Sequence, residues 1–162
     1  VSGNLPKSEE LMNESFALAR SQDDQYIFWS NVHRYAASLA QHDFVLKAKP
    51  LLKLCLEKFQ EGVGPYDSQT ISVMCNYADV LQLTGELKAA LHILESARDL
   101  QTQSLGHRHN EVAETSRDIA AIYSKMKQYS KALEILDTVL ETQQETIGAS
   151  SPSTLITQSN IA

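Results

Sequence analysis

An internal repeat of 42 residues constrains the fold of this chain more than any other feature. Gly64, Gly106 and Gly148 stand 42 residues apart, and the apolar run Ala90–Leu94 recurs one period later as Ala132–Leu136. A repeat of this size is typical of solenoids, in which each unit buries its apolar face against the next. The sequence therefore predicts three full units, over residues 22–63, 64–105 and 106–147, and the first helix of a fourth over residues 148–162.

Each unit is predicted to form two helices, because its apolar residues fall in two runs with helical spacing. In the second unit the first run includes Met74, Ala78 and Leu81, and the second includes Ala90 and Leu94. Gly85 separates the two runs, and glycine is a favoured residue at helix ends. The alternation of apolar and polar residues that is typical of strands is absent. The predicted fold is all-α, a solenoid of antiparallel helix pairs.

The residues before the first unit are predicted to add a capping helix. Residues 1–7 are expected to be a disordered start or the remnant of a tag. Over residues 8–21 the chain carries one apolar helical face, made of Leu11, Met12, Phe16 and Ala19. Such a helix would cap the stack or belong to a preceding unit. Phe28 and Trp29 are expected to contact it, although an exposed Trp29 would instead be a binding anchor.

Charge and composition exclude several classes of function. The chain has 20 Asp and Glu against 14 Lys and Arg, a net charge of −6, which argues against nucleic-acid binding. Its apolar runs are shorter than the roughly 18 residues that a membrane span requires. Cys55 and Cys75 are too few for a disulfide scaffold, and free thiols fit a reducing compartment. We expect a cytoplasmic location; because the chain begins at Val1 rather than Met, a mitochondrial one, with a targeting segment removed, stays open.

The sequence contains few residues in patterns that are typical of enzyme active sites. His107 and His109 form the only close histidine pair, and only Glu111 lies near them as an acid. A glycine-rich phosphate loop and a nucleophile elbow are both missing. Cys55 falls in a core position, and Cys75 is expected to be a small filler rather than a reactive thiol. We therefore expect no catalytic residue, no metal and no cofactor.

The repeat resembles the tetratricopeptide repeat family, whose pattern is W-x2-L-G-x2-Y followed by A-x3-F. The second unit reads Met74-x2-Tyr77-Ala78-x2-Leu81 and then Ala90-x3-Leu94. The 42-residue period and the linker Gly148-Ala-Ser-Ser-Pro152 resemble the subtype found in kinesin light chains. The resemblance covers residues 24–162. It implies a right-handed superhelix whose concave groove, lined by the first helices, binds protein segments.

The resemblance also implies which side chains line the groove. The amide of Asn76 or Asn160 would bond the backbone of an extended peptide, or it would space the helix pair. Arg34 or Arg117 would hold acids that flank an apolar or aromatic ligand residue, or the groove charges would pair with one another. The implied groove residues are His33, Arg34, Ser72, Cys75, Asn76, Asp79, Gln82, Glu114, Arg117, Asp118, Lys125 and Asn160.

One family function is excluded residue by residue. Tetratricopeptide proteins that bind the C-terminal carboxylate of chaperones use a clamp of Lys, Asn, Asn, Lys and Arg. Only Asn76 matches here, and the two acidic replacements, Glu114 and Asp118, would repel a carboxylate. The matching positions hold His33, Ala37, Asn76, Glu114 and Asp118. We do not expect this chain to bind chaperone tails.

Together these features predict a non-catalytic scaffold for protein–protein interaction, an adaptor module resembling the cargo-binding repeats of kinesin light chains. Its partner would be a protein or peptide segment, with neither nucleic acid nor membrane involved. The alternative is a structural repeat domain of a larger signalling or mitochondrial-complex assembly protein. In that case the chain would associate with itself through the open C-terminal end.

Overall fold

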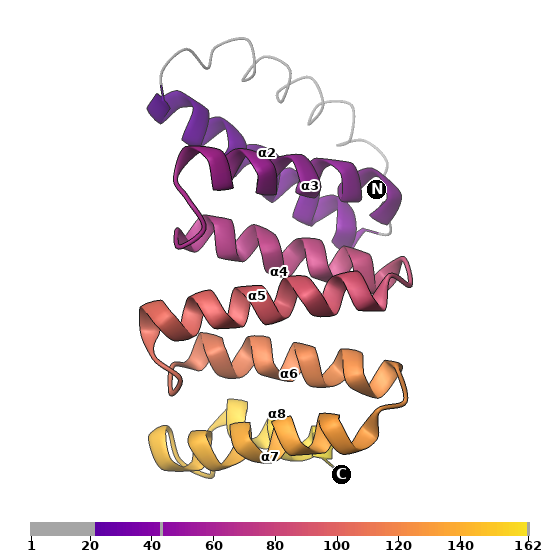
Figure 1. The fold of residues 1–162 in the computed structure, drawn as a ribbon, viewed down its shortest axis with the longest axis vertical. Coiled ribbons are helices and arrows are strands. Elements are labelled where there is room, and N and C mark those ends of the chain that lie inside the picture. The colour runs from indigo at the N-terminus through magenta and orange to yellow at the C-terminus, as the bar shows by residue number, and fades with distance from the viewer. Residues whose placement is uncertain (1–21, 43, 162) are drawn as a thin grey trace. The chain divides into compact units, whose positions relative to one another are not determined.

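The computed structural model describes residues 22–42 and 44–161, which form seven α-helices and no strand (Figure 1). Within this part of the chain, the predicted all-α fold is confirmed. The predicted capping helix over residues 8–21 lies outside the described residues. The helices are α2 (Gln22–Gln41), α3 (Val45–Gly62), α4 (Ser68–Leu83), α5 (Leu87–Leu105), α6 (Asn110–Lys125), α7 (Tyr129–Thr146) and α8 (Pro152–Ile161).

The linkers before α4 and α6 end in a side chain that caps the following helix. Asp67 Oδ1 accepts a hydrogen bond from the Gln69 backbone N–H at 2.9 Å. His109 Nδ1 accepts one from the Glu111 N–H at 3.3 Å. Gly106 has a φ of 86°, in the left-handed region that only glycine adopts without strain. The helix boundaries therefore follow from local chemistry.

The described chain divides into two compact units, one ending at Thr84 and the other beginning at Gly85. This division falls between the two helices of the second predicted repeat. In the first unit α2, α3 and α4 pack against one another (Figure 1). Its core includes Ala36 and Ala48, which are fully buried and whose small side chains let α2 and α3 approach closely. The other buried members are Phe28, Val32, Leu39, Leu52, Cys55, Phe59, Val73 and Val80.

In the second unit α5 packs on α6, α6 on α7, and α7 on α8. Ala120, Ala132 and Leu136 form an apolar cluster between α6 and α7. Two buried hydrogen bonds, one period apart, join successive helix pairs. Thr115 donates to Gln101 at 2.8 Å, and Thr157 donates to Gln143 at 2.7 Å. One period earlier, in the first unit, the positions equivalent to Gln101 and Thr115 hold the buried apolar residues Phe59 and Val73. The second unit therefore has buried polar pairs where the first has apolar side chains.

Candidate functional site

The predicted groove residues of the first unit lie on α2 and α4. Arg34, Ser72 and Asp79 are exposed, and Cys75, Asn76 and Gln82 are half-buried. The Arg34 guanidinium donates to Asn31 Oδ1 on its own helix at 2.6 Å. These side chains differ in exposure because α2 and α4 also contact each other. The first unit thus presents a mixed polar surface, whose role in binding stays a prediction.

His33 differs from the other predicted groove residues because it is buried, with 5% of its surface exposed. Asn76 Nδ2 donates to His33 Nε2 at 2.7 Å, which joins α4 to α2. Burial lowers the pKa of His33, while a hydrogen bond with the Gln69 side chain partly opposes that shift. His33 is therefore buried rather than exposed on a groove surface, and one amide hydrogen of Asn76 is used in the contact between α2 and α4. Whether either residue contacts a ligand stays a prediction.

In the second unit three predicted residues, Arg117, Lys125 and Asn160, line one hollow of about 530 Å³. Arg117 Nη1 donates to the backbone oxygen of Ser153 at 3.3 Å, which directs its side chain from α6 toward the start of α8. The predicted groove residues Glu114 and Asp118 are exposed and do not line the hollow. Glu114 instead accepts a hydrogen bond from Asn110 Nδ2 at 2.7 Å.

The rest of this hollow is mainly apolar. Ala120, Ala132 and Leu136 are buried and form its floor. Leu133 and Tyr129, which are 41% and 58% exposed, add apolar surface from α7. The described residues that line it include two basic side chains and no acidic one. We name this feature the α6–α8 hollow; an apolar group joined to an acidic one matches its lining.

Sequence reasoning missed Tyr129 and Leu133 as parts of this hollow. The family pattern assigns ligand contacts to the first helix of each unit, whereas both residues lie on α7, a second helix. The helical spacing of four between them places both on one face of α7. That spacing was visible in the sequence, but it does not say which face stays open.

Three further observations concern a thiol, metal binding and membrane insertion. Burial raises the pKa of the Cys55 thiol to about 12, which fits its predicted core position. Among the described residues no group of three or more histidine, cysteine or acidic side chains is arranged to hold a metal ion. The same residues contain no helix that is both long enough and apolar enough to cross a bilayer.

Comparisons with known proteins agree with this architecture. A tetratricopeptide repeat family model matches residues 69–145. No curated protein sequence matches the chain. A solved structure with nearly identical TPR-like repeats, from a candidate kinesin light chain of Podosopora anserina, is 20% identical with a TM-score of 0.82. The match covers 95% of this chain and 72% of that one.

Two further structures are similar. A single-substitution variant of the same P. anserina protein is 19% identical, with a TM-score of 0.83 over 95% of this chain and 72% of that one. BtubC (BKLC) from P. vanneervenii is 17% identical, with a TM-score of 0.73 over 96% of this chain and 62% of that one. These matches confirm the predicted solenoid fold. The tetratricopeptide repeat model thus matches residues 69–145, and the chain has the same fold as the solved TPR-like repeats of the kinesin light chain.

Proposed function

We propose that this chain is a non-catalytic scaffold that binds protein segments, an adaptor module similar to the cargo-binding repeats of kinesin light chains. The observation that carries the proposal is the α6–α8 hollow, in which Arg117 and Lys125 stand beside an apolar floor. Its volume of about 530 Å³ falls within the range of about 300–1,000 Å³ that is usual for ligand sites. We place this role in the cytoplasm, with mitochondria as the alternative.

The lining suggests the chemistry of the ligand. An apolar or aromatic side chain would bury against Leu133 and Leu136, which releases water from apolar surface on both partners. Acidic residues beside it would approach Arg117 and Lys125, and Arg–carboxylate hydrogen bonds are among the stronger ones in proteins. The ligand we propose is therefore a peptide segment with an apolar or aromatic residue flanked by acids.

The test is a peptide-display selection of natural sequences on the full chain. We expect the wild type to enrich segments of this composition and Arg117→Glu to lose them. Fluorescence anisotropy with one enriched peptide should then show an affinity loss of at least about tenfold, or about 1.4 kcal/mol. Circular dichroism should show that the variant keeps its helix content.

Arg108→Glu is the matched control. Arg108 makes an exposed ion pair with Glu145 at 3.2 Å, in the linker before α6, and does not line the hollow. The same change of charge there should leave peptide affinity within about twofold, because exposed charges at a distance are screened by salt. Enrichment that survives Arg117→Glu, or is lost equally in both variants, would remove the α6–α8 hollow as the binding site.

A second candidate function is self-association through α8. Leu155 and Ile156 are exposed on this helix, and neighbouring exposed apolar side chains favour contact with another protein surface. Sedimentation velocity over a range of concentrations separates the two functions. A monomer at all concentrations excludes self-association, whereas a dimer that Ile156→Asp dissociates supports it.

A further inference from the structure

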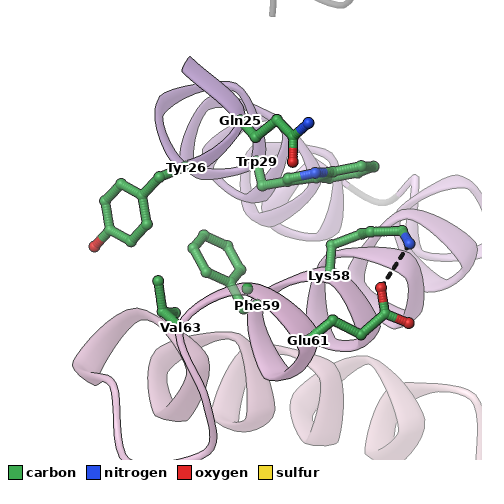
Figure 2. A pocket seen from close by; sticks show the side chains of 8 residues that line it. Gln25, Tyr26, Trp29, Lys58, Phe59, Glu61 and Val63 are labelled. Atoms are coloured by element: carbon green, nitrogen blue, oxygen red, sulfur yellow. Dashed lines mark hydrogen bonds and ion pairs between the residues drawn. The ribbon is translucent and has the colours of Figure 1, made fainter. Parts of the chain in front are cut away.

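A second hollow, of about 540 Å³, lies in the first unit between the beginning of α2 and the end of α3 (Figure 2). Aromatic side chains make up much of its surface. Tyr26 packs edge-on against Phe59 with ring centroids 5.6 Å apart, and Trp29 packs against Phe28 at 4.9 Å. Tyr26 and Val63 are 36% and 45% exposed. This hollow therefore offers apolar surface that a further chain segment could cover.

The charges at the rim favour an apolar occupant. Lys58 Nζ and Glu61 Oε2 form an ion pair at 2.7 Å and offset each other (Figure 2). The other side chains that line the hollow, which include Gln25, Tyr26 and Trp29, carry no charge. A charged ligand would find no uncompensated partner among the described lining residues, whereas apolar side chains would gain from leaving water.

We propose that the occupant is the chain's own segment Ser8–Arg20. Its sequence predicts an amphipathic helix, and Leu11, Met12, Phe16 and Ala19 share one face when 100° per residue is applied. Glu10, Glu14 and Ala17 fall on the opposite face. A helix with one apolar face needs an apolar surface to cover, and the hollow supplies one.

The position of the segment in the chain supports this pairing. It ends one residue before Ser21, and α2 begins at Gln22. Helices joined by a loop of about 2–5 residues pack as antiparallel neighbours, and the proposal places such a loop around Ser21. Counted from Ser21, Phe16 lies five residues before the turn and Tyr26 lies five residues after it, so an antiparallel arrangement puts both rings at one level. The short tether also gives the segment a high effective concentration at this site.

Trp29 lines the hollow and is the only tryptophan in the chain, so its fluorescence reports directly on the site. In the full chain, Phe16→Glu should shift the Trp29 emission to the red and raise its acrylamide quenching constant about twofold, because an aromatic ring that loses its cover meets water. Ala17→Glu adds the same charge on the opposite face of the predicted helix. It should leave both quantities unchanged.

A second measurement keeps the proposal testable if Phe16→Glu unfolds the first unit. In the wild type, nuclear Overhauser contacts should join the Phe16 ring to the ring of Tyr26 or Trp29. Absence of these contacts, or equal emission changes in the two variants, would overturn the proposal. Emission that shifts with protein concentration in the wild type would assign the hollow to a second copy of the chain and would also overturn it.

Discussion

His33 on α2 and Asn76 on α4 are joined by a hydrogen bond in which Asn76 Nδ2 donates to His33 Nε2 across 2.7 Å. The ring nitrogen can accept this hydrogen only while the imidazole is neutral. Burial acts in the same direction, because a charged ring loses its hydration and its pKa falls. The contact between α2 and α4 is therefore sensitive to protonation.

The first prediction concerns the pH dependence of stability. The pKa of His33 is lower in the folded chain than its ordinary value of 6.5, so below that value the unfolded chain binds a proton that the folded ring does not. The contribution of the neutral His33 ring to folding stability is complete above pH 6.5 and is lost as the pH falls toward the pKa of the folded state. We expect the free energy of unfolding in urea to decrease there, with a contribution from His33 no steeper than about 1.4 kcal/mol per pH unit.

Two variants isolate this contribution. His33→Gln removes the titrating ring and should flatten the difference between neutral and mildly acidic pH. His42→Gln changes an exposed histidine at the C-terminal side of the same helix, whose Nδ1 donates to the Ser38 carbonyl oxygen at 2.8 Å. It should keep the wild-type slope. The same slope in the wild type and in His33→Gln would contradict the prediction.

The second prediction is a double-mutant cycle on the buried pair of Gln101 and Thr115. Thr115→Val should cost about 1–3 kcal/mol, because Gln101 Oε1 then loses the hydroxyl that donates to it at 2.8 Å. Gln101→Leu should cost a similar amount by leaving the Thr115 hydroxyl buried without its acceptor. The double variant should cost much less than the sum, with a coupling of about 0.5–3 kcal/mol measured by urea unfolding.

The first unit shows why the double variant should be tolerated better than either single variant. One period earlier the same two positions hold Phe59 and Val73, both buried in the apolar core. An apolar pair is therefore compatible with this helix crossing, and a half-satisfied polar pair is not. Costs of the two substitutions that simply add would show that the hydrogen bond does not couple the residues.

The third prediction concerns the cap of α6. Aspartate is a better N-cap than histidine because its carboxylate accepts strongly and interacts favourably with the positive end of the helix dipole. Asp67 already caps α4 with a shorter hydrogen bond than His109 makes on α6, 2.9 Å against 3.3 Å. His109→Asp should raise the free energy of unfolding by about 0.5–1 kcal/mol in urea. His107→Asp adds the same charge two residues earlier, and an equal gain there would attribute the effect to charge alone.

The fourth prediction concerns the two thiols. A pKa of about 12 leaves Cys55 almost entirely protonated at neutral pH, and its side chain is fully buried. Iodoacetamide should therefore modify half-buried Cys75 well before Cys55. In Cys75→Ser, mass spectrometry should detect modification only after urea unfolds the chain. Rapid labelling of native Cys75→Ser would show that the first unit opens locally around α3.

Much of the fold follows from the sequence by itself because its causes are local. Helical spacing of apolar residues, the caps at Asp67 and His109, and glycine in the left-handed region at Gly106 act within a few residues of the chain. Repetition of these signals at 42 residues predicts helix pairs and the family resemblance. The predicted binding residues Arg117, Lys125 and Asn160 followed from that resemblance, and they line a common hollow.

Only the tertiary structure decided which side chains remain accessible. His33 and Asn76 are 43 residues apart, and the packing of α2 against α4 turned two predicted ligand contacts into partners of each other. The same kind of packing left Tyr129 and Leu133 of α7 open beside Arg117 of α6. Helical periodicity gives the face on which a residue lies. Whether that face is covered depends on helices distant in sequence, and this is why burial and pairing could not be predicted from the repeat.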